Sequence, residues 1–260
     1  MKGYKTTIQW TDQTVNFWTG CQKVSDGCKF CYMYRIIEGN GGNGNIVKKT
    51  GKSNYQKALS WSESQMIFTN SMSDFFIKEA DAWREEAWDV IRRTPQHRWQ
   101  ILTKRPERIL ECLPNDWGRE GYPNVWLGTT IENNNTKDRL LELQKAKTKN
   151  SKFLTFLSVE PLLEDVDFTS DPEILETFKG LDWVILGGES GNDSGKYTYR
   201  PCEIDWIESM VKQCKGHGIP VFVKQMGTHL YKRLKMTDRH GGNINEFPAQ
   251  LRIREFPVKK

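Results

Sequence analysis

The 260-residue sequence has no long apolar run, which argues against a membrane-spanning segment. No stretch approaches the roughly 18 consecutive apolar residues that a transmembrane helix needs. The opening residues, MKGYKTTIQW, lack the apolar core of a secretory signal peptide. No long Pro/Ser-rich linker divides the chain. We therefore expect a cytoplasmic protein without a membrane partner.

Cysteine and histidine are both scarce, with six and four residues. In a cytoplasmic chain, thiols more often bind metals, act in catalysis or stay buried than form disulfides. The formal net charge of +5 is mildly basic. This charge permits an anionic partner, such as a nucleic acid, but does not require one.

Strand-like apolar runs alternate with amphipathic helical patterns along the whole chain. We predict buried strands at residues 66–69, 99–103, 125–131, 153–159, 183–186 and 220–223, with a possible first strand at 14–19. Helical patterns lie at 80–93, 106–113, 136–147 and 203–216. Such alternation is typical of parallel βα units. It predicts an α/β fold, a partial (β/α)6-7 barrel, with a doubly wound open sheet as the alternative.

The barrel is expected to occupy residues 1–230. Residues 231–260 then form a basic C-terminal extension that packs on the same domain. The basic side chains of this region are Lys232, Arg233, Lys235, Arg239, Arg252, Arg254, Lys259 and Lys260.

Polar side chains follow each predicted strand. They include Asn70, Ser71, Ser73, Asp74, Lys104, Arg105, Thr129, Thr130, Glu132, Glu160, Glu189, Lys224 and Gln225. The carboxyl ends of parallel strands meet on one face, so these residues predict a polar ligand site there. The run Gly187–Gly191 could either cradle a ligand or form a tight turn.

The most informative motif is Cys21-x6-Cys28-x2-Cys31, in a loop after the first candidate strand. A structural zinc site needs four protein ligands, so zinc would require a distant fourth ligand, such as Cys112, Cys202 or His217. Three cysteines suit an iron–sulfur cube better, because one iron then remains open for a non-protein ligand. We therefore predict a [4Fe-4S] cluster on Cys21, Cys28 and Cys31.

This motif resembles the radical-SAM cysteine motif, although the common form has three residues between the first two cysteines. Phe30 matches the family's aromatic residue, which packs near the adenine of S-adenosylmethionine (SAM). The wider chain resembles a phage- and bacteria-associated radical-SAM-like family of unassigned function. The matching stretches include IQWTDQTVNFWTGCQKVSDGCKFCY, IFTNSMSDFF, NVWLGTTIEN, FLSVEPLL and DWVILGGESG.

The resemblance implies that the open iron chelates the methionine end of SAM. Flavodoxin or ferredoxin would supply one electron, and cleavage of SAM would give methionine and a 5′-deoxyadenosyl radical. On charge, Lys104 or Arg105 would bind the SAM carboxylate. Ser71, Ser73 or Asp74 would accept from its amino group, and Glu160 and Thr129 would contact its ribose.

Two classes of function follow. One is a radical-SAM enzyme whose favoured substrate, from the basic tail and the phage association, is a nucleic acid or nucleotide. The other is a metal-stabilised nucleic-acid-binding protein with a structural zinc–cysteine site and no radical chemistry.

Overall fold

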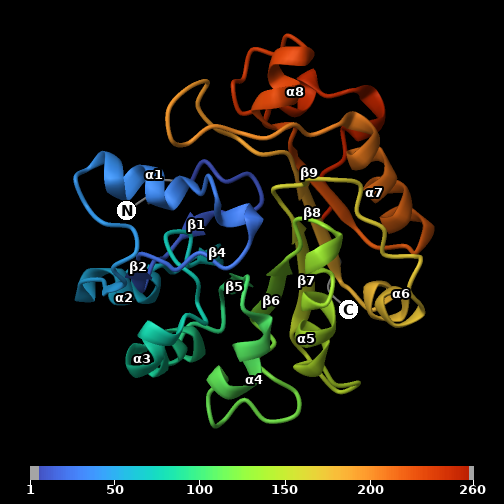
Figure 1. The fold of residues 1–260 in the computed structure, drawn as a ribbon. Coiled ribbons are helices and arrows are strands. Elements are labelled where there is room, and N and C mark those ends of the chain that lie inside the picture. The colour runs from blue at the N-terminus through green and yellow to red at the C-terminus, as the bar shows by residue number, and fades with distance from the viewer. Residues whose placement is uncertain (1–5, 258–260) are drawn as a thin grey trace.

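The computed structural model describes residues 6–257 and contains one parallel sheet of seven strands. The strands are β1 (Gln13–Thr14), β4 (Met66–Thr69), β5 (Arg98–Thr103), β6 (Val125–Thr130), β7 (Leu154–Val159), β8 (Trp183–Gly187) and β9 (Val221–Gln225). Their spatial order follows their order in the chain. A doubly wound sheet reverses direction at a switch point, so that alternative is excluded. The sheet curls into a half-barrel (Figure 1).

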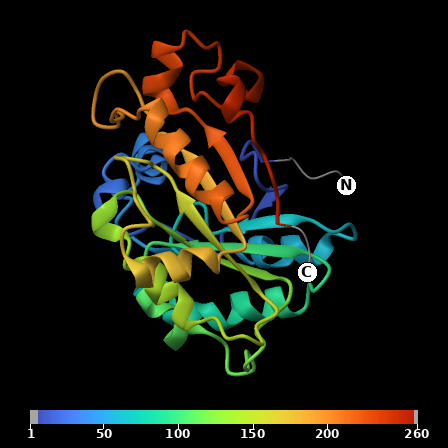
Figure 2. The same cartoon turned by 90° about the vertical axis from the view of Figure 1, so that its right-hand side faces the viewer.

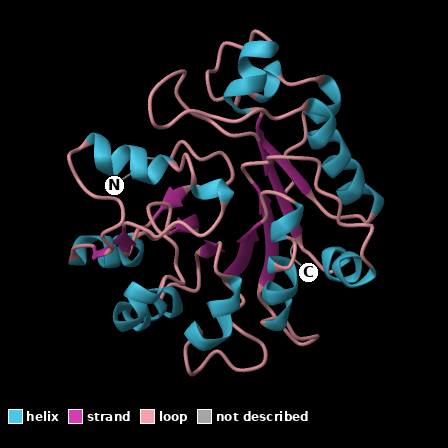
Figure 3. Ribbon diagram, in the orientation of Figure 1, coloured by secondary structure: helices cyan, strands magenta, loops and turns pink. Residues whose placement is uncertain are grey.

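Helices surround the outer side of this half-barrel (Figure 3). The helices are α1 (Tyr32–Gly39), α2 (Lys52–Lys57), α3 (Asp81–Arg92), α4 (Ile109–Cys112), α5 (Arg139–Lys145), α6 (Pro172–Lys179), α7 (Ile204–Gly216) and α8 (Gly227–Arg233). The mixed α/β architecture of parallel βα units agrees with the sequence prediction.

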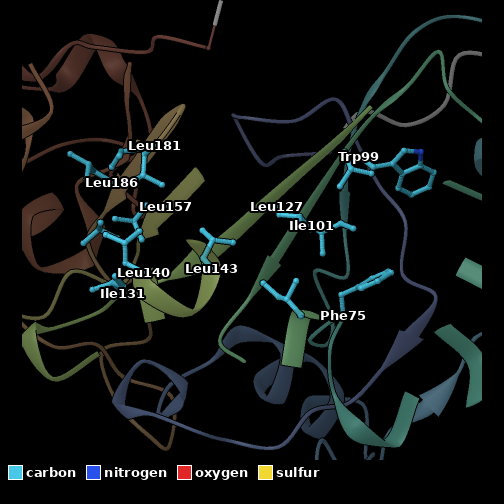
Figure 4. Packing of buried hydrophobic residues seen from close by; sticks show 14 of the residues in the cluster. Phe75, Trp99, Ile101, Leu127, Ile131, Leu140, Leu143, Leu157, Leu181 and Leu186 are labelled. Carbon is cyan, nitrogen blue, oxygen red and sulfur yellow. The ribbon is translucent and has the colours of Figure 1, made fainter. Parts of the chain in front are cut away.

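The main hydrophobic core lies between the sheet and the outer helices. Alternate strand residues such as Ile101, Leu127 and Leu157 point toward it and are fully buried. Leu140 and Leu143 of α5 pack against them from outside (Figure 4). Because side chains alternate between the two faces of a strand, the remaining strand residues face the inside of the half-barrel.

The inner face changes character along the strands. Toward the amino ends it is aromatic, and the cluster there is Trp10, Phe68, Trp126, Phe156, Trp183, Ile185 and Phe222. Gly128 gives this cluster room, because a β-carbon at Gly128 would lie 2.5 Å from the Phe156 ring. The carboxyl ends carry polar side chains instead. The half-barrel is therefore closed by aromatic packing at one end and open to ligands at the other.

The strand predicted at residues 14–19 is divided in two. β1 pairs with β4, whereas β2 (Trp18–Thr19) pairs antiparallel with β3 (Lys48–Lys49) outside the main sheet. The break occurs where the Phe17 N–H donates to Asn70 Oδ1 at 2.7 Å rather than to a neighbouring strand. The helix predicted at 106–113 is shorter, because residues 106–108 form a 3-10 turn before α4.

The C-terminal segment returns along the edge of the sheet (Figure 2). The Val223 N–H donates to Ile253 O at 2.9 Å, and the Glu255 N–H donates to Val221 O at 3.0 Å. Leu251 and Phe247 are buried in the main core. The predicted boundary at residue 230 falls within α8. Between residues 6 and 257, no helix combines the length and the apolar character needed to cross a membrane.

Candidate functional site

A cavity of about 730 Å³ opens at the carboxyl ends of the strands. It brings together ten of the residues predicted to bind the cluster or SAM, which are Cys21, Cys28, Phe30, Cys31, Ser71, Ser73, Asp74, Lys104, Arg105 and Glu160. These residues come from the loop after β2 and from the ends of β4, β5 and β7. The convergence expected from a parallel sheet is therefore present.

The cysteines lie on one segment, residues 20–31, which we call the cysteine loop. Backbone bonds tie its start to its neighbours: the Gly20 N–H donates to Met72 O at 3.0 Å, and the Cys21 N–H donates to Gly44 O at 2.9 Å. Gly20 has a φ of +85°, and a β-carbon there would lie 2.2 Å from Ile46 O. Glycine is thus required where the loop enters the cavity rim.

Arg105 and Asp74 hold the first cysteine in place. Arg105 donates to Gln22 O at 2.7 Å and to Cys21 Sγ at 3.7 Å, and its guanidinium lies 3.2 Å from Asp74 Oδ2. Asp74 also accepts from Thr103 Oγ1 at 2.7 Å. Burial, with the nearby Asp74 charge, raises the pKa of Cys21 to about 12 despite the opposing effect of Arg105. Cys21 is therefore a neutral thiol at pH 7.

Glu132 connects the middle of the cysteine loop to the barrel. Its side chain is fully buried, and its carboxylate accepts from Ser25 Oγ at 2.7 Å and from Arg139 Nη1 at 2.9 Å. Lys104 Nζ lies 4.0 Å from the same carboxylate. A buried charge needs such partners. Burial opposes the charge on Lys104, but Glu132 and the cysteines outweigh it and raise the pKa of Lys104.

Arg200 fastens the far side of the loop. Its Nε donates to Glu189 Oε2 at 2.9 Å and its Nη1 to Asp26 O at 2.9 Å, while its guanidinium lies 5.4 Å from the centre of the Phe30 ring.

The glycines on either side of Glu189 allow neighbouring backbone to approach closely. A β-carbon on Gly188 would lie 2.3 Å from Met226 O, and one on Gly191 would lie 2.0 Å from Thr198 O. Neither Gly188 nor Gly191 has a positive φ, and residues 188–191 form no turn, so the tight-turn interpretation of this run is wrong; glycine is needed here because neighbouring backbone approaches closely.

The prediction for Thr129 needs correction. Thr129 is fully buried outside the cavity, and its hydroxyl donates to Thr103 O at 3.1 Å. Its neighbour Thr130 lines the cavity, because it shares the inward face of β6 with Trp126 and Gly128. Because the Thr129 side chain points away from the cavity, Thr129 cannot contact the ribose of a ligand bound there.

The predicted acceptors after β4 already bind protein groups. Ser73 Oγ donates to Gly20 O, Ser71 Oγ donates to Asn16 Oδ1 at 3.3 Å, and Asp74 accepts from the Lys104 N–H at 2.9 Å. These residues hold the cavity wall and the cysteine loop together. Any contact with a ligand would add to this role.

Two buried polar atoms of the cavity lining have no hydrogen-bond partner among the described residues: Asn70 Nδ2 and Thr130 Oγ1. A buried donor without a partner costs roughly 1–3 kcal/mol. Both atoms can donate, so a ligand with oxygen or nitrogen acceptors would satisfy them. Together with the nearby thiols, this donor set fits a polar cofactor bound at a metal cluster.

The ligands that a zinc site would need are elsewhere. Cys112 Sγ accepts from Arg108, Cys202 is buried in the main core, and the His217 ring packs edge-on against Phe178. None of the three lines the cavity. Across residues 6–257, no group of three His, Cys, Asp or Glu side chains is arranged to hold a metal ion, and this includes Cys21, Cys28 and Cys31.

Fold and site together define a parallel α/β half-barrel with a cysteine-bearing, ligand-sized cavity at its open end. The chain belongs to the DUF5131 family, described as a protein family of unknown function, whose model matches residues 5–248. No curated protein and no solved structure matches the chain.

Proposed function

We propose that this protein is a radical-SAM enzyme that carries a [4Fe-4S] cluster on Cys21, Cys28 and Cys31. The observation that supports this most strongly is the anchored cysteine loop, which places all three cysteines in the lining of one cavity. The curled parallel sheet, consistent with a partial barrel, gives that cavity polar residues at its rim. Three protein thiolates would leave one iron for SAM. Reduced by one electron, such a cluster would supply the electron that splits SAM into methionine and a 5′-deoxyadenosyl radical.

The chain's own residues would bind and orient SAM. Lys104, which stays protonated beside Glu132, would pair with the SAM carboxylate. Asn70 and Thr130 would donate their unused hydrogen bonds to the same ligand. Phe30 would pack on the adenine, with Arg200 stacked near it to fix the ring. Glu160 would contact the ribose, although in the structure its carboxylate accepts from Lys224.

A nucleotide or nucleic acid is the favoured substrate. Arg35, Lys224 and His240 come from three different segments and all line the cavity. Among the described residues, no carboxylate lies within 4.0 Å of Arg35, so its charge is available to a phosphate. The C-terminal extension supports this less, because Lys232 binds Asp193, Arg233 binds Glu203 and Arg254 donates to Gly242 O. Lys259 and Lys260 lie outside the described residues.

Metal analysis of the purified protein distinguishes the radical-SAM function from the competing function with a structural zinc–cysteine site. Protein reconstituted anaerobically with iron and sulfide should bind about four irons per chain and absorb broadly in the visible range. Single Cys21→Ala, Cys28→Ala and Cys31→Ala variants should lose most of this iron. Cys112→Ala should keep it, because Cys112 lies away from the cavity. One tightly bound zinc per chain with no iron uptake would contradict the proposal.

A further inference from the structure

Helix α1 presents an apolar surface to the cavity. Tyr32 is 41% exposed and Ile36 is 44% exposed, and both residues line the cavity. Residues four positions apart lie on the same face of a helix, so these two side chains are neighbours. Adjacent apolar groups that stay exposed in a ligand-sized cavity mark a surface that a ligand covers. None of the proposed SAM contacts uses this surface.

The α1 surface is held in place from two sides. The Tyr32 hydroxyl donates to Ser71 O at 2.5 Å, which fixes the far end of the side chain against the loop after β4. Tyr34, on the other side of α1, is buried and packs in one cluster with Tyr197. A surface that is already ordered loses little conformational entropy when a ligand binds to it. The ring of Tyr32 is therefore preorganised to receive a flat partner.

Arg35 places a positive charge beside this apolar surface. It lies three positions after Tyr32, on the same side of α1, and it also lines the cavity. Its Nη1 donates to Asn192 Oδ1 at 3.5 Å, and this partner carries no charge. Bases stack on aromatic side chains, and phosphates pair with guanidinium groups. A nucleotide carries both groups in one unit, so it matches the combination that α1 offers.

We propose that Tyr32, Arg35 and Ile36 bind one unpaired nucleotide, with its base on the apolar surface and its phosphate on the guanidinium. This inference rests on the proposed function and narrows its substrate class. In a duplex the neighbouring base pairs cover both faces of a base, so a base reaches this surface only after leaving the stack. Because Tyr32 directly follows Cys31, a base held there lies beside the proposed cluster. The substrate is then a free nucleotide or a nucleotide of a single strand.

The test compares fluorescein-labelled single-stranded DNA and RNA oligonucleotides with duplexes of the same sequence. Their binding to the anaerobically reconstituted protein with SAM is measured by fluorescence anisotropy. The better single strand should bind about tenfold or more tightly than its duplex. Ile36→Asn should weaken single-strand binding by about fivefold or more, whereas the apolar Ile36→Leu should keep most of the affinity.

Leu110→Asn is the matched control. Leu110 is 53% exposed on α4 and does not line the cavity, so this variant loses a similar apolar side chain elsewhere and should bind like the parent. Equal affinities of the parent for single strand and duplex would overturn the inference. Equal single-strand affinities of Ile36→Asn and Leu110→Asn would overturn it as well.

Competition distinguishes the two sources of the nucleotide. Displacement of the single strand by an unlabelled nucleoside monophosphate supports a free nucleotide, and single-strand binding that resists this competitor supports a nucleic acid. The absence of binding by both ligands would contradict the inference. Iron content and 5′-deoxyadenosine formation by the parent, measured on the same preparation, test the proposed function separately. Either claim can therefore fail while the other holds.

Discussion

Gly27 and Glu132 are so close that a β-carbon on Gly27 would lie 2.5 Å from the Glu132 carboxylate oxygen. The Glu132 carboxylate also accepts a hydrogen bond from Ser25 Oγ at 2.7 Å. Ser25 and Gly27 of the cysteine loop therefore both contact the buried Glu132 side chain. The position of Cys28, directly after Gly27, therefore depends on a residue at the end of β6.

A Gly27→Ala substitution tests this dependence. The added methyl group must push the loop away from Glu132, which should destabilise the protein by about 1–3 kcal/mol and lower its iron content after reconstitution. Chemical denaturation and iron analysis measure the two effects. Gly39→Ala is the control, because no atom would lie within 4 Å of its β-carbon. Full iron loading and parental stability in Gly27→Ala would show that the loop is not held by this contact.

Lys104→Met tests the proposed SAM carboxylate contact. Losing a charged hydrogen bond should weaken SAM binding by about 1.5–3 kcal/mol, a factor of roughly 10 to 150 in the dissociation constant. Equilibrium dialysis of the reconstituted protein gives this constant. The exposed Lys145→Met variant should bind SAM normally. An unchanged dissociation constant in Lys104→Met would remove this lysine from the site.

His240 at the cavity rim provides a test that depends on pH. Partial burial lowers its pKa below the usual 6.5, and the charges of Arg239, Arg35 and Lys224 lower it further against the opposing effect of Asp238. The folded protein thus binds this proton less tightly than the unfolded chain. The stability linked to His240 is complete above about pH 6.5 and is lost as the pH falls through the lower folded pKa.

A phosphate bound by Arg35 beside His240 should raise the pKa of His240, because the anion stabilises the imidazolium. With four histidines in the chain, NMR can follow each ring, and a His240→Gln variant assigns the signal. A nucleoside monophosphate should shift the titration midpoint of His240 upward in the parent but less in Arg35→Gln. A midpoint that does not respond to the nucleotide would argue against a phosphate subsite here.

The strand positions could be predicted because strands of a covered parallel sheet are nearly continuous apolar runs. β4 to β8 lie within one residue of their predicted places, and β9 ends two residues later than predicted. The inward position of Thr130, rather than Thr129, also follows from the sequence, because two-residue alternation from Trp126 points Thr130 inward. α6 was also recognisable: Asp171 caps it by accepting from the Glu173 and Ile174 N–H groups, and Pro172 occupies its first turn.

Other parts of the site could not be predicted from the sequence. Ser25 and Glu132 are 107 residues apart, and Arg200 reaches Asp26 across 174 residues. Such pairings depend on how the loops pack over the barrel, and local sequence patterns carry no information about them. The cysteine spacing identified the loop, but the residues that anchor it became evident only from the fold.

Reductive cleavage of SAM tests the central claim most directly. The anaerobically reconstituted protein, incubated with dithionite and SAM, should form 5′-deoxyadenosine, measured by chromatography and mass spectrometry. The Cys28→Ala variant should form none above background, whereas Cys112→Ala should match the parent. Equal product from the parent and Cys28→Ala, or no product from a parent that carries about four irons, would contradict the account.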